Sequence, residues 1–119
     1  MTASNSSAKP TLAELKERAH RSFHFLEEWL YSPDTDDDEQ LQAYLETAME
    51  VLYPAEHDPR EVQDARSYEE VEIAIRETMR YLMESSVRWR KDQWFRYHLL
   101  VALDFLQGIP FHKPGQIIV

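Results

Sequence analysis

Residues 68–107 read YEEVEIAIRETMRYLMESSVRWRKDQWFRYHLLVALDFLQ, a stretch without proline or glycine. Local propensity therefore permits one continuous helix, which would be roughly 60 Å long at about 1.5 Å per residue. A compact domain of this size is much narrower, so we expect the helix to break. Ser85 and Ser86 are the poorest helix formers in the stretch. We place the break there and predict a last helix over residues 87–107.

The rest of the chain also favours helices. Only two glycines occur, so β-hairpins and phosphate-binding loops, which need positive φ, are hard to build. Thr11 and Ser67 each precede a glutamate by three residues, the capping-box spacing, and apolar residues follow at helical period. The aspartates of residues 36–38 suit the positive end of a further helix. Pro54 ends that helix, and Gly108 is suited to end the last one.

These signals predict an all-α fold, a small helical bundle of about four helices over residues 11–109. Residues 1–10 are expected to form a disordered N-terminus. Residues 110–119, which contain two prolines, are expected to form an extended C-terminal tail. The sequence shows no convincing internal repeat.

Composition limits the classes of function. The chain has no cysteine, which removes disulfides, thiolate metal sites and cysteine nucleophiles. Its N-terminus lacks the apolar segment of a signal peptide, and its longest apolar run, residues 99–103, is far shorter than a membrane span. We therefore expect a cytoplasmic protein that does not enter a membrane and needs no cofactor.

Acidic residues are concentrated in the middle of the chain. Sixteen of the 22 aspartates and glutamates fall within residues 27–72, where only Arg60 and Arg66 oppose them. Such a region is typical of a solubilising surface, or of a docking surface for a partner with a basic surface, including one that mimics the phosphate backbone of nucleic acid. Direct nucleic-acid binding is not expected.

The opposite character appears in residues 87–98, where cationic and aromatic side chains alternate. Arginine and large aromatics are enriched in interface hot spots. After the helix buries one face, we expect Trp89, Phe95 and the basic side chains to remain available to a partner. The predicted partner-binding residues are Arg88, Trp89, Arg90, Lys91, Phe95, Asp36, Asp37 and Asp38.

The same segment has an alternative use within the protein itself. The positive charge of residues 87–98 is complementary to the acidic middle of the chain, so the two can pair within one molecule or across a symmetric dimer. The helix over residues 87–107 is also apolar almost all round, more than three neighbouring helices can cover. We therefore expect a homodimer.

Histidines suggest one candidate metal site. His20 and His24 lie one helical turn apart, and Glu27 and Glu28 follow on the same side. Two imidazoles at this spacing can chelate a transition ion, but two further ligands are needed. Exposed polar side chains are the favoured interpretation of all four residues, so no metal is expected.

The prediction for function is a small acidic protein-binding module that acts as a regulator, inhibitor or adaptor of a partner protein. It rests on the absence of a nucleophile constellation, a phosphate loop or a complete metal motif. The alternative is a magnesium-dependent all-α phosphohydrolase using paired carboxylates. The candidate pairs are Glu46 with Glu50, Glu61 with Asp64, and Glu69 with Glu72. Convergence of three or more carboxylates on one cavity would favour the enzyme.

Overall fold

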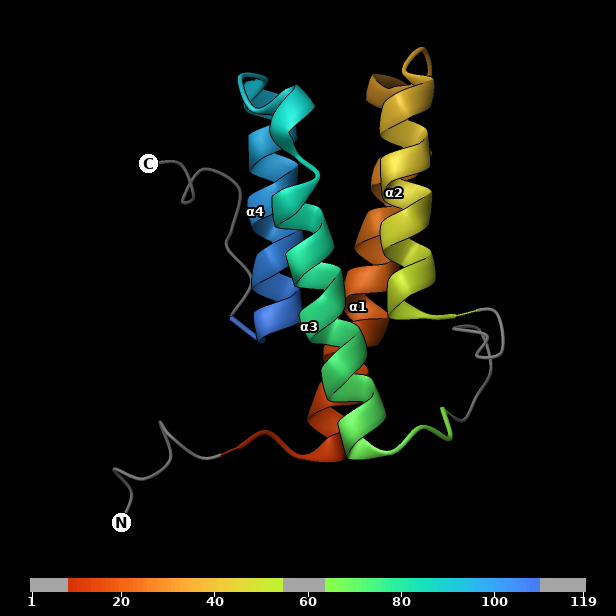
Figure 1. Ribbon diagram of the computed structural model, residues 1–119, viewed down its shortest axis with the longest axis vertical. Coiled ribbons are helices and arrows are strands. Elements are labelled where there is room, and N and C mark those ends of the chain that lie inside the picture. Colours follow the sequence, from red (N-terminus) through yellow and green to blue (C-terminus); the bar gives the residue numbers. More distant parts are fainter. Residues whose placement is uncertain (1–8, 55–63, 110–119) are drawn as a thin grey trace.

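The described part of the chain folds into four α-helices and two short 3₁₀ turns (Figure 1). The computed structural model describes residues 9–54 and 64–109, apart from the side chain of Asp34. In chain order the elements are α1 (Leu12–Leu30), the 3₁₀ turn η2 (Pro33–Thr35), α2 (Glu39–Leu52), α3 (Tyr68–Glu84), the 3₁₀ turn η3 (Val87–Trp89) and α4 (Gln93–Gln107). These described residues contain no strand, which confirms the all-α prediction. The predicted tail and most of the predicted disordered N-terminus lie outside them.

Successive helices run in opposite directions, so the bundle is of the up-down type (Figure 1). α1 packs against both α2 and α4, and α2 packs against α3. α1 and α3 also meet across the bundle, whereas α3 and α4 form the loosest pair of neighbours. The connections from α1 to α2 and from α3 to α4 lie at the same end, which we call the loop end (Figure 1).

Side-chain caps fix where the helices begin and end. Thr11 and Ser67 each form a complete capping box with the glutamate three residues later, as predicted. Asp38, the last of the predicted aspartates, caps α2 by accepting the N–H of Leu41 at 3.0 Å. Gly108 ends α4 in the left-handed conformation, with φ of 76°. The two capping boxes, the Asp38 cap and the Gly108 terminus are therefore confirmed.

The break in residues 68–107 is confirmed, but the predicted start of the last helix is wrong. Residues after Ser86 form the turn η3, and α4 begins only at Gln93. Ser86 makes no cap, because its hydroxyl donates back to the carbonyl of Met83 at 2.9 Å. Asp92 is the true N-cap, and its carboxylate accepts the N–H groups of Trp94 and Phe95. One aspartate side chain thus satisfies two of the unpaired N–H groups that begin a helix.

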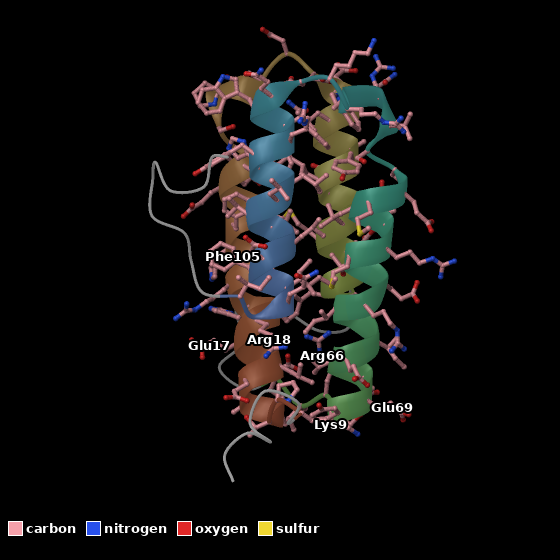
Figure 2. The ribbon with its side chains drawn as sticks, turned by 90° about the vertical axis from the view of Figure 1, so that its left-hand side faces the viewer. Lys9, Glu17, Arg18, Arg66, Glu69 and Phe105 are labelled. Atoms are coloured by element: carbon pink, nitrogen blue, oxygen red, sulfur yellow. The ribbon has the colours of Figure 1, made fainter. Side chains whose placement is uncertain are left out.

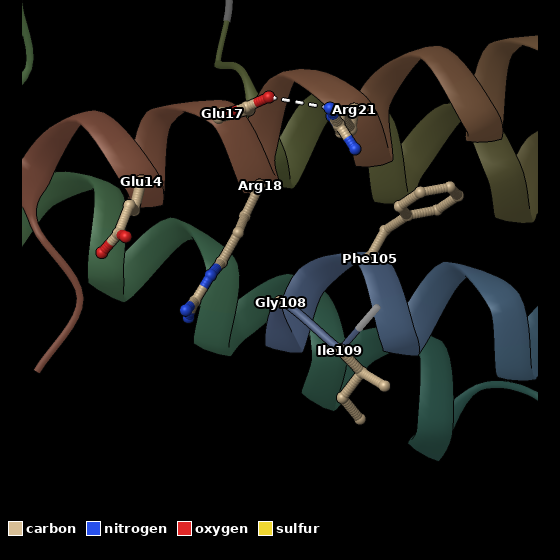
Figure 3. A pocket seen from close by; sticks show the side chains of 7 residues that line it. All are labelled: Glu14, Glu17, Arg18, Arg21, Phe105, Gly108 and Ile109. Carbon is tan, nitrogen blue, oxygen red and sulfur yellow. Dashed lines mark ion pairs between the residues drawn. The ribbon is translucent and has the colours of Figure 1, made fainter. Parts of the chain in front are cut away.

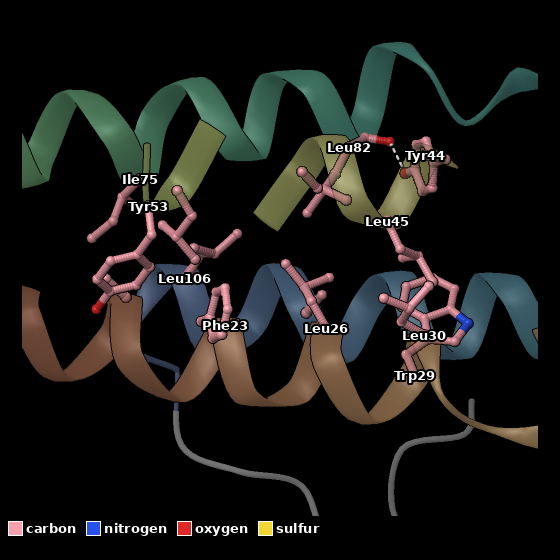
Figure 4. Close-up of a cluster of buried hydrophobic side chains, with 14 of the residues drawn as sticks. Phe23, Leu26, Trp29, Leu30, Tyr44, Leu45, Tyr53, Ile75, Leu82 and Leu106 are labelled. Atoms are coloured by element: carbon pink, nitrogen blue, oxygen red, sulfur yellow. Dashed lines mark hydrogen bonds between the residues drawn. The ribbon is translucent and has the colours of Figure 1, made fainter. Parts of the chain in front are cut away.

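Leucines from all four helices form the centre of the core (Figure 4). Each of these side chains contributes about 1.5–3 kcal/mol through burial. The fully buried leucines are Leu26 of α1, Leu45 and Leu52 of α2, Leu82 of α3 and Leu106 of α4. Near the loop end the core becomes aromatic, with Trp29 and Tyr44 packed around Phe95 at ring separations of 5.4 and 5.6 Å.

The chain is built from two helical hairpins of the same design. α1–η2–α2 and α3–η3–α4 each begin with a capping box and reverse through a serine, a 3₁₀ turn and an aspartate N-cap. The turns share backbone hydrogen bonds: Asp38 N–H donates to Thr35 O at 3.1 Å, and Asp92 N–H donates to Trp89 O at 2.9 Å. The sequence shows no convincing repeat, and the structure adds a likeness of the two hairpins in their caps and in the backbone hydrogen bonds of their turns.

Candidate protein-interaction surface

Two connecting segments of opposite charge lie side by side at the loop end. The acidic loop, residues 32–38, joins α1 to α2, and the basic loop, residues 85–92, joins α3 to α4. The indole Nε1 of Trp89 donates to the Asp38 carboxylate at 3.1 Å, so the two loops are in direct contact. The structure thus brings together the two regions that the sequence marked as partner-binding.

The acidic loop is held from inside by Thr35. This residue is fully buried, and its hydroxyl donates to the carbonyl of Leu30 at 2.6 Å. Gln42 of α2 supports the same loop by donating from Nε2 to the carbonyl of Thr35 at 2.8 Å. With the backbone fixed in this way, the side chains of Asp36 and Asp37 are exposed to solvent.

The basic loop is held by Trp89, whose indole packs on Phe95 and Tyr44 at ring separations of 5.3 and 5.0 Å. Phe95 itself is only 3% exposed, so it belongs to the core and cannot contact a partner. Trp89 is half-buried and holds the loop rather than offering a free ring. We therefore remove both aromatics from the contact surface. The predicted contact residues that stay exposed here are Arg88, Arg90 and Lys91.

The contact between the loops also affects the titration of Asp38. The N–H of Leu41, donating to this carboxylate, holds its pKa below the ordinary value, and burial partly opposes that effect. The Trp89 N–H and the charge of Arg88 act in the same direction as Leu41. Asp38 is therefore ionised at neutral pH and serves as the charged link between the two loops.

Exposed apolar side chains gather at the same end, and the sequence did not single them out. Tyr31 is 75% exposed, Trp94 66%, Val87 59% and Met83 55%. Tyr31 follows the last residue of α1, and Met83 lies in the last turn of α3, so both border the loops. Large side chains of this kind, placed among charged residues, are typical of a protein-binding surface.

Trp94 is outside because of its position around α4. Phe95 faces inward in line with Ala102 and Leu106, and the preceding residue is turned by about 100° from that face. The sequence assigned Trp89 and Phe95 to the outside instead, because this helix is apolar almost all round and its buried face did not stand out. The helical spacing of Phe95, Ala102 and Leu106 is the signal that would have placed Phe95 inside.

His20 and His24 lie close together, as their spacing indicated. Their Nε2 atoms are 3.1 Å apart, and His24 Nδ1 is 3.6 Å from a carboxylate oxygen of Glu27. Glu28 is exposed and lines a groove beside α4. Across residues 9–54 and 64–109, no three His, Asp or Glu side chains are arranged to share a metal ion. The four residues remain a polar surface of α1, and we build no metal site on them.

A groove between α1 and α4 is a second surface feature that the sequence did not predict (Figure 3). It consists of two adjoining pockets of about 270 and 450 Å³, which share Arg21 and Phe105. Arg21 is paired with Glu17 at 2.9 Å, and the guanidinium of Arg18 lies against Gly108. The groove mixes acidic, basic and aromatic groups, so its chemistry selects no particular ligand. It depends on helix packing, which spacing along the sequence does not reveal.

Arg66 is the buried charged residue at the other end of the bundle (Figure 2). Its guanidinium pairs with Asp64 at 2.8 Å and donates to the carbonyl of Leu52 at 2.9 Å. It also lies over the ring of Tyr53, 4.5 Å from the centroid. The side-chain hydrogen bonds from Arg66 hold the pKa of Asp64 below its ordinary value. This cluster closes the end of α2 and has a structural role.

Comparison with protein-family models, curated proteins and solved structures gives no significant match. No described helix combines the length and the apolar character that crossing a lipid bilayer requires. The candidate site therefore rests on its own geometry, a pair of oppositely charged loops bordered by exposed apolar side chains.

Proposed function

We propose that this chain is a protein-binding module that regulates or links other proteins, and that it contacts them through the loop end. The observation that carries the proposal is the gathering of Tyr31, Met83, Val87 and Trp94 around two loops whose backbones are fixed from inside. Hot spots are centred on such rigid, exposed aromatic anchors with charged rims. Fixed loops also lose little conformational entropy on binding.

The charge pattern favours a protein partner of mixed character over mimicry of nucleic acid. A mimic needs a continuous row of negative charge in place of phosphates. At the loop end, Asp36 and Asp37 lie beside a loop that carries Arg90 and Lys91. The cationic loop interrupts the row, so the proposal does not include mimicry.

The magnesium-dependent phosphohydrolase gains no specific support. The candidate pairs Glu46 with Glu50 and Glu69 with Glu72 are exposed on α2 and α3, and Glu61 lies outside the described residues. Within the described part of the chain, carboxylates do not converge in the group of three that would bind the cation. We therefore carry forward the binding function alone.

The test compares two exposed side chains of α4. Trp94→Ala removes an anchor at the loop end, whereas Leu100→Ala removes an exposed side chain farther along the same helix. Proteins captured from the native cell by the parent chain should also be captured by Leu100→Ala and lost by Trp94→Ala. For a purified partner, the loss should be about 1–3 kcal/mol of binding free energy. Equal capture by both variants would place the binding surface elsewhere.

A further inference from the structure

We infer that the loop end is self-complementary and binds the loop end of a second copy of this chain. The inference rests on the proposed function and names the partner of the same surface. It is carried by three observations: the matched turns of the two hairpins, the opposite charges at corresponding positions, and the exposed apolar residues beside them.

The matched turns define which residues correspond. Asp36 follows η2 and donates its N–H to the carbonyl of Pro33 at 3.3 Å. Arg90 follows η3 and donates its N–H to the carbonyl of Val87 at 3.2 Å. The next residues along the chain are Asp37 and Lys91, and all four charged side chains are exposed. Asp36 and Asp37 of the acidic loop thus have the positive counterparts Arg90 and Lys91 in the basic loop, while the two caps, Asp38 and Asp92, are alike.

The helix packing relates these positions by an approximate two-fold axis along the bundle. Rotation about that axis exchanges α1 with α3 and α2 with α4. The same rotation exchanges the α1–α4 contact with the α2–α3 contact, and these two contacts are similarly extensive. The contact of α3 with α4 is looser than its counterpart between α1 and α2, so the symmetry is partial. The acidic and basic loops therefore lie on opposite sides of the centre of the loop end.

Two such ends fit together in one symmetric way. A second copy, turned over about an axis perpendicular to the bundle, places its basic loop on the first copy's acidic loop and its acidic loop on the first copy's basic loop. A second possible axis is also perpendicular to the bundle, at right angles to the first. Rotation about it would place each loop against the same loop of the other copy, so like charges would meet, which is unfavourable. The charge pattern thus favours one of the two arrangements, and assembly in this arrangement ends at a closed dimer.

The exposed apolar residues supply the part of the interface that charge does not. Exposed ion pairs are each worth only about 0.2–1 kcal/mol, which is too little to hold two chains together. Burial of apolar surface between the copies is the main source of stability, and Tyr31 and Trp94 are the largest such side chains at this end. Association should consequently weaken as salt rises but persist in part, because screening acts on the loops and not on the apolar contact.

A charge-swap experiment tests the inference. One variant carries Asp36→Lys and Asp37→Lys, so the pair of exposed charges at these corresponding positions is basic in both loops; the other carries Arg90→Asp and Lys91→Asp, so the pair is acidic in both loops. Sedimentation velocity should show self-association weakened by at least about tenfold in each variant alone, because both loop contacts become repulsive. A mixture of the two variants should associate within about threefold of the parent chain, because both contacts are again complementary. Recovery in the mixture also shows that both variants are folded.

The matched control is Glu69→Lys with Glu72→Lys, which changes the net charge as Asp36→Lys with Asp37→Lys does. Its two positions lie near the start of α3, at the end of the bundle opposite the loops (Figure 2). This variant should associate like the parent chain. A parent chain that stays monomeric would overturn the self-association alone, and the capture experiment with Trp94→Ala would still test the proposed function. The inference would also be overturned if both loop variants dimerise as strongly as the parent chain. The same holds if the variants are weakened and their mixture does not restore association.

Discussion

The two hairpins build the same turn with different side chains. In α1–η2–α2 the buried Thr35 bonds to carbonyls of its own hairpin, and the turn is complete without outside help. At the corresponding position of α3–η3–α4, Trp89 reaches across to Asp38 of the first hairpin. The first turn is therefore self-sufficient, while the second depends on the first. The difference shows that a pattern of backbone hydrogen bonds can be kept while its means of support, and its surface charge, are exchanged.

The largest expected effect concerns the junction between the hairpins. Replacing Arg66 by Met leaves Asp64 and the carbonyl of Leu52 without their buried partner. The free energy of unfolding should fall by about 3–5 kcal/mol, the cost of breaking a buried ion pair. Urea denaturation followed by circular dichroism measures it. Arg76→Met, at an exposed position of α3, is the control and should change stability by less than about 0.5 kcal/mol. If Arg66→Met and Arg76→Met changed stability equally, the guanidinium of Arg66 would be solvated rather than buried.

The two aspartate caps offer the most direct comparison of the hairpins. Asp92→Ala removes a helix cap and should cost about 1 kcal/mol. Asp38→Ala removes a cap together with the acceptor of the Trp89 N–H, and should cost about 2 kcal/mol. In a Trp89→Phe background the two costs should become equal. If they are equal already in the parent chain, the second turn does not depend on the first.

Tyr44 provides a second bond between the hairpins, farther into the core. Its hydroxyl donates to the carbonyl of Leu82 at 2.5 Å, and burial raises the pKa of the phenol, so the proton stays in place. Tyr44→Phe leaves that carbonyl unpaired and should lower stability by about 1–2 kcal/mol in thermal unfolding. Tyr81 stacks on Tyr44 but is only half-buried, and Tyr81→Phe should have little effect. A neutral Tyr44→Phe would show that water replaces the bond.

The capping boxes test where the hairpins are equivalent. Thr11 and Ser67 each accept the N–H of a glutamate that in turn accepts their own N–H. Thr11→Ala and Ser67→Ala should each lower the free energy of unfolding by about 0.5–1 kcal/mol. The two losses should be similar, because both boxes are exposed at the end away from the loops. Chemical denaturation of both variants in one series checks this. A large inequality would limit the likeness of the hairpins to their turns.

The last prediction concerns how the contribution of Asp64 to stability changes in acid. Its folded-state pKa lies below the ordinary value of 3.8, chiefly because Arg66 bonds to the carboxylate. The stabilisation is therefore fully present above the ordinary value and is lost as the pH falls through the lower folded value. Asp64→Asn should be less stable than the parent chain at pH 7, and the difference should shrink toward pH 2. Parallel stability curves in acid would contradict the assignment.

The parts of the fold that the sequence predicted are those fixed within a few residues. Capping boxes, the aspartate cap of α2 and the Gly108 terminus are bonds between near neighbours, so their spacing is visible in the sequence. The start of α4 was missed because two candidates lay close together. Ser86 had the right side chain, but only Asp92 lies where its carboxylate meets two free N–H groups.

The candidate site was predicted in composition but not in arrangement. Asp36 and Asp37 were found from the concentration of acidic residues. Arg90 and Lys91 were found from the alternation of cationic and aromatic side chains, although they were expected on the last helix. The bond from Trp89 to Asp38 joins residues 51 positions apart, and spacing gives no information at that distance. The likeness of the two loops was missed because the residues between the shared serine and aspartate differ, with opposite charges at Asp36 and Arg90 and at Asp37 and Lys91.

The two ends of the described chain leave the bundle on the side away from the loops. Lys9 lies at the end opposite the loops, and Gly108 closes α4 as that helix returns from them (Figures 1 and 2). A Cβ at Gly108 would collide with Arg18, so the exit from α4 is tied to α1. A label or a fused protein joined to the bundle directly at Lys9 or Gly108 would therefore lie away from the charged loops and leave them open to a partner.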